Sequence, residues 1–294
     1  MGAQNISVSI TINISSEMSL TEVSSNRSFN GYQKVYEHKS EVLKCQMKFG
    51  AYIPDEHDSA LPVLIYLSGL TCTEANFIDK SGFQRFASEE KVIVINPDTS
   101  PRGIKIDGDD ESYDFGTGAG FYLNATEPKW SEHYRMYSYV VEELYKLMFA
   151  NFKVDANRVG IFGHSMGGHG ALVLGLRNPN LFRSISAFAP ICNPTNCPWG
   201  HKVFQGYLGS VEAGSQYDAT EIAKNYDGPE RNVLLDQGLD DQFLKEQLHP
   251  ENLLTVKNPK IKFDYRSRPK YNHSYFYIAT FIGEHFKFHV DSWK

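Results

Sequence analysis

The chain has few cysteines, no excess of positive charge and no long apolar run, and each shortage excludes a class of protein. Four cysteines in 294 residues cannot build a disulfide scaffold, so we expect reduced thiols and a cytoplasmic location. Lysine and arginine number 29 against 35 aspartates and glutamates, and the net charge is -6. This balance argues against a nucleic-acid partner, which requires a basic face. No run reaches the roughly 18 apolar residues that span a bilayer, so no membrane partner is predicted.

The amino terminus also lacks the basic stretch and apolar core of a secretory signal. Residues 1–20 are rich in serine, asparagine and threonine, which indicates a flexible leader. Residues 21–294 show neither an internal repeat nor a linker, so they are predicted to form a single domain. Met1 and Met18 both stay open as the first residue of the natural protein.

Short apolar runs alternate with helical patterns along the chain, which predicts an α/β fold. The predicted strands are 47–53, 63–67, 92–96, 184–188, 232–236 and 261–265. The predicted helices are 77–91, 133–149, 242–253 and 275–290. A long packed loop is expected over 100–129 and a polar insertion over 192–227. This order indicates a mostly parallel central sheet with helices on both faces.

Residues 163–167 read Gly-His-Ser-Met-Gly and follow the apolar run 158–162. A strand, a serine between two glycines and then a helix is the order of a nucleophile elbow, and it indicates the α/β-hydrolase fold. Glycine on both sides avoids backbone collisions at a sharp turn. Ser165 is therefore the predicted nucleophile, and the Met166 backbone N–H is a predicted oxyanion donor.

A nucleophilic serine needs a base and an orienting acid, which follow in the order Ser, Asp, His in elbow-type hydrolases. His273 lies just before the last helix and is the predicted base. The acid is sought in the loop after strand 232–236, where Asp240 and Asp241 are both candidates. Asp241 is preferred because it stands further beyond the turn glycine, Gly238.

The second oxyanion donor is sought after strand 63–67, where Gly69 lets the backbone turn and the Leu70 N–H is assigned. Cys72 lies close by, either as a reactive thiol or, preferably, as a small buried residue. His285 and His289 are one helical turn apart, but Phe286 stands where a zinc-protease motif has glutamate. We therefore expect these two histidines on a solvated or partly buried helix face.

With these parts placed, the chain resembles the S-formylglutathione hydrolase (esterase D) family from about residue 20 to its end. The resemblance rests on ordered motifs: Leu-Ser-Gly-Leu-Thr-Cys-Thr at 67–73, Pro-Asp-Thr-Ser-Pro-Arg-Gly at 97–103, Gly-Ala-Gly-Phe-Tyr at 118–122, the elbow at 163–170, Asn-Pro at 193–194, Pro-Trp-Gly at 198–200, Gly-Tyr-Leu-Gly at 206–209, Asp-Gln-Gly at 236–238 and His-Ser-Tyr at 273–275.

The resemblance implies hydrolysis of S-formylglutathione to glutathione and formate in formaldehyde detoxification. It also implies Ser165, Asp241 and His273 as the catalytic triad, and a homodimer. Neither a metal nor an organic cofactor is implied. One departure is Asn272, where the family usually has aspartate before the catalytic histidine. This change leaves the triad intact and puts the reaction rate in question.

Glutathione is anionic, so local cations are needed to offset the net charge of the protein. Arg102 and Lys202 are candidates, and Trp199 is a candidate pocket wall. The alternative function is a general carboxylesterase or acyl-transferase of the same fold. A non-catalytic binding protein of this fold is disfavoured, because all three triad residues are present.

Overall fold

The strands of the computed structural model, which describes residues 19–55 and 58–294, form one sheet. Within these residues the sheet order is β1-β2-β3-β5-β4-β6-β7-β8-β9. The bounds are β1 (Thr21–Arg27), β2 (Gly31–Ser40), β3 (Cys45–Pro54), β4 (Leu61–Leu67), β5 (Ile93–Pro97), β6 (Val154–His164), β7 (Ser184–Phe188), β8 (Arg231–Gly238) and β9 (Ile261–Arg268). Apart from Ser19 and Leu20, the predicted leader lies outside the described residues, and the division into leader and one domain stays a prediction.

Strands β4 to β9 run parallel, whereas β1, β2 and β3 pair in antiparallel fashion at one end of the sheet. The predicted mostly parallel α/β sheet is confirmed. Sequence reasoning placed no strand over β1 or β2. The residues of β1 are almost all exposed, so this strand has no apolar run that could have revealed it.

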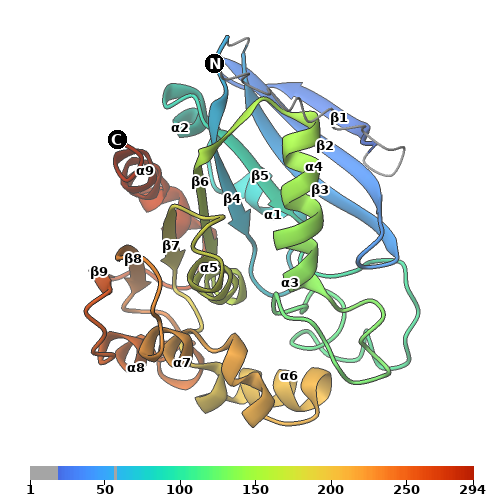
Figure 1. Ribbon diagram of the computed structural model, residues 1–294, viewed down its shortest axis with the longest axis vertical. Coiled ribbons are helices and arrows are strands. Elements are labelled where there is room, and N and C mark those ends of the chain that lie inside the picture. The colour runs from blue at the N-terminus through green and yellow to red at the C-terminus, as the bar shows by residue number, and fades with distance from the viewer. Residues whose placement is uncertain (1–18, 56–57) are drawn as a thin grey trace, which may run out of the picture.

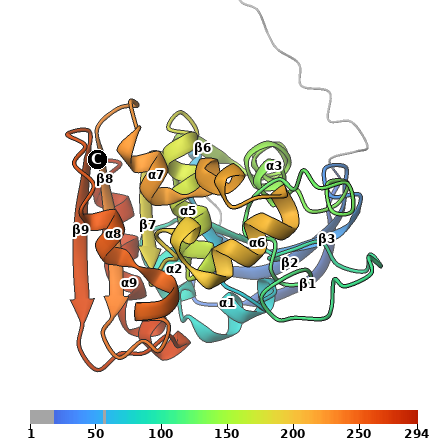
Figure 2. The ribbon, with the colours of Figure 1, turned by 90° about the horizontal axis from the view of Figure 1, so that it is seen from below.

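Helices cover both faces of the sheet (Figures 1 and 2). On one face, α1 (Glu74–Lys80) and α2 (Gln84–Glu89) pack against the last helix, α9 (Tyr275–Asp291). On the other face, α5 (Met166–Arg177) lies against β4, β6 and β7. The remaining α-helices are α3 (Met136–Ser138), α4 (Tyr145–Asn151), α6 (Pro198–Leu208), α7 (Ala219–Lys224) and α8 (Pro250–Leu254). There are π-helical turns at Tyr139–Leu144 and Leu244–Leu248, and short 3-10 turns at Pro194–Asn196 and Glu212–Tyr217. None of the helices among the described residues is long and apolar enough to cross a membrane.

Two helices predicted as continuous are each broken in the structure. The segment 77–91 divides into α1 and α2 because Gly82 adopts a φ of +67°, which ends the right-handed winding. The segment 242–253 divides at His249, whose φ is +46°, just before Pro250. The insertion 192–227 contains α6 and α7, which the sequence reading did not predict.

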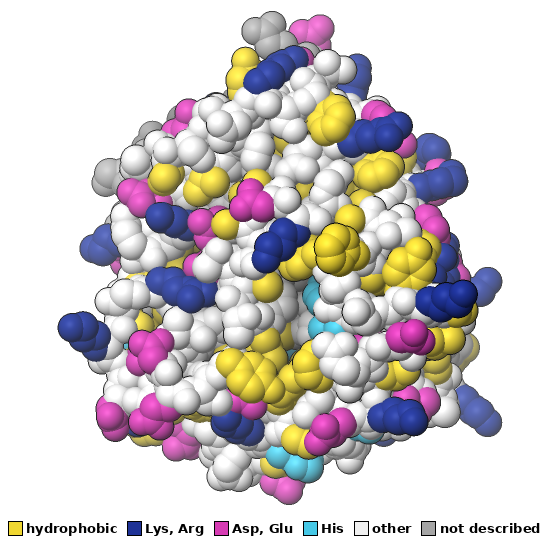
Figure 3. All heavy atoms as spheres, turned by 180° about the vertical axis from the view of Figure 1, so that it is seen from behind, with side chains coloured by type: hydrophobic (Ala, Val, Ile, Leu, Met, Phe, Trp, Pro, Cys, Tyr) yellow, Lys and Arg dark blue, Asp and Glu magenta, His cyan; other side chains and the backbone are white. Residues whose placement is uncertain are grey.

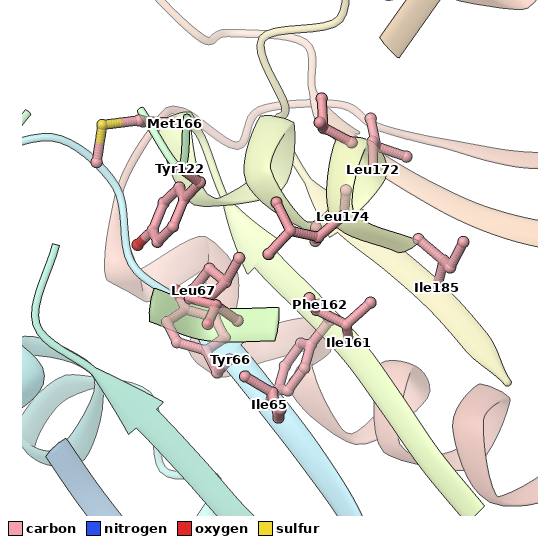
Figure 4. Close-up of a cluster of buried hydrophobic side chains, with 14 of the residues drawn as sticks. Ile65, Tyr66, Leu67, Tyr122, Ile161, Phe162, Met166, Leu172, Leu174 and Ile185 are labelled. Atoms are coloured by element: carbon pink, nitrogen blue, oxygen red, sulfur yellow. The ribbon is translucent and has the colours of Figure 1, made fainter. Parts of the chain in front are cut away.

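Part of the core lies between α5 and the central strands, where side chains such as Leu67, Ile161 and Leu174 are fully buried (Figure 4). Strands β4 and β6 are in parallel register, with Leu67 opposite Gly163. The Tyr122 hydroxyl donates to the Ser68 carbonyl over 2.9 Å and fixes the backbone just beyond β4. The core therefore brings the loop after β4 next to the turn after β6.

Candidate active site

Ser165 occupies a strained turn between β6 and α5. Its φ of 61° and ψ of -120° lie in a region that non-glycine residues rarely adopt. A Cβ on Gly163 would lie 2.2 Å from the Gly167 carbonyl oxygen, and one on Gly167 would lie 1.9 Å from the Leu67 carbonyl oxygen. Both glycines are therefore sterically required, and the turn has the geometry of a nucleophile elbow.

The two predicted oxyanion donors follow the neighbouring strands β4 and β6. Met166 is the first residue of α5, so its N–H is among those without an intrahelical acceptor. Leu70 lines the same pocket as Ser165. Gly69 precedes Leu70 in the loop after β4. If this glycine carried a Cβ, that atom would lie 3.2 Å from the Cβ of Ser165, so the loop passes close to the serine.

Asp241 and His273 meet beyond the carboxyl ends of β8 and β9. The His273 Nδ1 lies 2.5 Å from the Asp241 Oδ2, and the side chain of Asp241 is fully buried. The Phe243 backbone N–H and the Gln237 side-chain amide also donate to this carboxylate, over 2.9 and 3.2 Å. Asp240 is exposed. The geometry thus brings Asp241, and not Asp240, to the imidazole.

Ser165 and His273 line one pocket of about 310 Å³. On the face shown in Figure 3, histidine side chains lie in a hollow bordered by hydrophobic side chains. Within the described residues, the side chains of Ser165 and His273 do not form a hydrogen bond with each other. Catalytic hydrogen bonds in ligand-free enzymes are often long and tighten once substrate binds. The pocket places both groups where one substrate can reach them.

Two histidines flank the elbow in the buried interior. The ring centre of His164 is 4.3 Å from that of His273, and burial, together with the charge of His273, holds the pKa of His164 well below its usual value. His169 is fully buried with its Nε2 3.1 Å from the Phe121 carbonyl oxygen, and burial lowers its pKa to about 4. Both imidazoles are therefore neutral at physiological pH, and His164 adds no competing charge beside His273.

Cys72 and Trp199 both line the pocket, as the sequence suggested. Cys72 is partly buried, and burial raises the pKa of its thiol, which keeps it protonated at neutral pH. The indole Nε1 of Trp199 donates to the Tyr113 hydroxyl over 3.3 Å, and its ring packs against Phe243.

Neither Arg102 nor Lys202 is among the described residues that line the pocket. Arg102 is ion-paired to the buried Asp98 over 2.8 Å and also donates to the Cys72 carbonyl. Lys202 is ion-paired to Asp114 in the long loop. Both charges are used inside the protein, so the geometry gives no support to the predicted contacts with glutathione.

Asn272 is exposed beside His273.

Three pocket-lining aromatic residues were not predicted as site residues: Tyr113, Phe243 and Tyr275. Phe243 and Tyr275 each stand two residues after a predicted triad member, and that spacing is the signal that could have revealed them. The ring of Phe243 lies edge-on to the His273 imidazole at 5.0 Å, so it covers the base from one side.

The expectation for His285 and His289 is wrong, because both are fully buried on the face of α9 that packs against the sheet. His289 lies between the hydroxyls of Ser184 and Ser186, at 2.6 and 2.8 Å. Each ring finds its partner in the serines of β7, which is why the polar groups can be buried. In the part of the chain that the structure describes, no group of three His, Cys, Asp or Glu side chains could hold a metal ion.

Comparison with known proteins finds relatives that match nearly the whole chain. The model of the esterase family (putative esterase) matches residues 40–288. S-formylglutathione hydrolase of Rattus norvegicus is 56% identical over 277 residues, which cover 93% of this chain and 98% of the relative. The enzyme of the same name from Arabidopsis thaliana is 49% identical, with the same coverage.

The chain belongs to the S-formylglutathione hydrolase family. The family resemblance seen in the sequence is therefore confirmed, and the protein is a serine hydrolase. A solved structure of an S-formylglutathione hydrolase from Agrobacterium tumefaciens superimposes with a TM-score of 0.89 at 43% identity, covering 93% of this chain and 99% of the other. The α/β-hydrolase fold of the family is confirmed as well.

Proposed function

We propose that this protein hydrolyses the thioester S-formylglutathione to glutathione and formate, with Ser165 as nucleophile, His273 as base and Asp241 as acid. The observation that carries the assignment is the short Asp241–His273 contact beside a strained serine in one pocket. The names of the relatives supply the substrate.

The reaction follows from the positions of these groups. The Ser165 oxygen attacks the thioester carbonyl while its proton passes to Nε2 of His273. Asp241 holds the imidazole by its Nδ1–H and stabilises the imidazolium. The N–H groups of Leu70 and Met166 hold the tetrahedral oxyanion, and loss of one such donor typically costs roughly 2.7–4 kcal/mol of barrier.

The tetrahedral intermediate collapses when the carbon–sulfur bond breaks, and the glutathione sulfur takes the proton from His273. Water then enters the pocket, gives a proton to His273 and attacks the formyl-serine ester. Collapse of the second intermediate returns that proton to Ser165 and releases formate. This chemistry needs neither a metal nor an organic cofactor.

Steady-state kinetics on S-formylglutathione test the proposal against a general carboxylesterase. We expect kcat/KM for S-formylglutathione to exceed the value for simple aryl esters such as p-nitrophenyl acetate by orders of magnitude. Equal or better turnover of aryl esters would instead support the general esterase.

A cytoplasmic homodimer is proposed as well. Support for the location comes from the four cysteines, all of which are free thiols. Support for the dimer comes only from the family resemblance. Light scattering on the purified protein would test it, and a monomer mass of 33.3 kDa would contradict it.

A further inference from the structure

The pocket presents an electrostatic problem that the triad does not solve. Glutathione carries two carboxylates and one ammonium group, and the protein carries a net charge of -6. The loop that supplies Tyr113 to the pocket is itself acidic, with carboxylates at Asp107, Asp109, Asp110, Glu111 and Asp114. A cation near the pocket is therefore required to attract the substrate.

Lys80, the last residue of α1, meets this requirement. Lys80 does not itself line the pocket, but its Nζ lies 5.9 Å from the centre of the Tyr275 ring, and Tyr275 does line it. Its charge also acts on a second lining residue, Cys72, where it opposes the larger effect of burial on the thiol pKa.

The ammonium group of Lys80 is exposed, and within residues 19–55 and 58–294 it has no carboxylate at ion-pair distance. In this it differs from Arg102 and Lys202, whose charges are neutralised by Asp98 and Asp114. The contact of Lys80 with the Tyr275 ring is a cation–π interaction, which leaves the ammonium free to bind an anion.

We propose that Lys80 binds a carboxylate of the glutathione moiety and so determines specificity for the thiol half of the substrate. This inference rests on the proposed function. The glycine carboxylate of glutathione lies about two residues of chain from the sulfur, or roughly 7 Å, and the γ-glutamyl carboxylate, which is linked through its side chain, can lie somewhat further away. The flexible lysine stem carries its ammonium over the Tyr275 ring, beside the pocket.

The test compares Lys80→Gln and Lys80→Arg with a control, Lys257→Gln. Lys257 is also exposed and unpaired within the described residues, but it precedes β9 and so lies at the end of the sheet away from the site. We expect Lys80→Gln to raise KM for S-formylglutathione about two- to fivefold with kcat unchanged, as for an exposed ion pair. Lys80→Arg and the control should keep the wild-type KM, and added salt should reduce the difference.

A second readout separates this inference from the proposed function. S-methylglutathione cannot be hydrolysed, so its inhibition of p-nitrophenyl acetate hydrolysis measures glutathione binding even if S-formylglutathione proves a poor substrate. The inhibition constant should rise in Lys80→Gln, while KM for the uncharged ester stays the same. Esterifying the glycine carboxylate of the inhibitor should cancel the difference if that group is the partner, and should preserve it if the γ-glutamyl carboxylate is.

The proposal is overturned if Lys80→Gln has the wild-type inhibition constant for S-methylglutathione and the wild-type KM for S-formylglutathione. It is equally overturned if the variant changes KM for p-nitrophenyl acetate as much as for S-formylglutathione, since Lys80 would then act on the pocket and not on the charge.

Discussion

Two sets of Ser, His and Asp side chains occur in this protein, and only one of them can act on a substrate. The first set, Ser165, His273 and Asp241, belongs to the pocket at the carboxyl ends of the strands. The second lies beneath α9, where the His285 Nδ1 is 2.8 Å from the Ser186 hydroxyl and its Nε2 is 3.9 Å from the Asp236 carboxylate.

The two sets differ in access and in the way their carboxylates are used. Ser186, His285 and Asp236 are all fully buried. Asp236 also accepts from Arg268 over 2.6 Å and from the Tyr277 hydroxyl over 2.8 Å. The second set therefore fastens β7, β8, β9 and α9 together. Residue type alone does not make a triad; a pocket, a strained serine and unpaired backbone donors are also required.

Removal of the serine hydroxyl from each set should separate these roles most strongly. Ser165→Ala should lower kcat by about 10⁶-fold with an unchanged thermal melt, because the nucleophile is lost and the fold is not. Ser186→Ala should keep its activity but lower the unfolding free energy by roughly 1–3 kcal/mol, because it leaves buried imidazole nitrogens unpartnered. Activity lost in Ser186→Ala without loss of stability would reverse the comparison.

The neighbouring aspartates offer a sharper test within the proposed catalytic set. Asp241→Ala should lower kcat by roughly 10⁴-fold, since the imidazole loses the carboxylate that holds it. Asp240→Ala should keep most of the turnover, because Asp240 is exposed to solvent. Kinetics on S-formylglutathione for both variants decide the matter, and the opposite ranking would show that the acid is misassigned.

The pH dependence of stability should reveal His289, the buried histidine that shares the Ser186 hydroxyl with the second set. Burial, together with the charge of His285, holds the pKa of His289 well below its usual value, so the folded protein keeps this ring neutral. Below about pH 6.5 only the unfolded chain takes up the proton, and the unfolding free energy falls with pH by up to about 1.4 kcal/mol per pH unit from this group. Urea titrations from pH 7 to pH 5 should therefore give a shallower loss in His289→Gln than in the wild type. Equal slopes would mean that His289 is protonated in the folded state.

Cys72 should give the smallest effect. Its thiol lines the pocket but is protonated at neutral pH, because burial raises its pKa. Cys72→Ser should retain full activity on S-formylglutathione, and alkylation of the wild type should slow the enzyme by crowding alone. A large loss of kcat in Cys72→Ser would instead give the thiol a chemical role.

The sequence predicted the parts of this molecule that depend on local patterns. The run 184–188 coincides with β7, and the Gly-x-Ser-x-Gly spacing predicted a turn in which added Cβ atoms would collide with backbone. These features follow from apolar periodicity and from the sterics of neighbouring residues. The mostly parallel sheet and the nucleophile elbow could therefore be predicted from the sequence alone.

The rest depends on contacts between distant segments. The burial of His285 and His289 requires the serines of β7, about a hundred positions away, and a helical pattern alone cannot show such partners. Arg102 and Lys202 have the right charge for glutathione, but Asp98 and Asp114 already pair with them. Lys80 carried no local signal, because only the packing of α1 beside α9 brings it to Tyr275.

Labelling with a fluorophosphonate, followed by mass-spectrometric mapping of the modified residue, tests the central assignment most directly. The reagent reacts only with a serine whose proton is accepted by a base and whose oxygen is open to solvent. The account predicts one adduct, on Ser165, that is absent from His273→Ala. An unlabelled wild-type protein, or an adduct on Ser184 or Ser186, would contradict it.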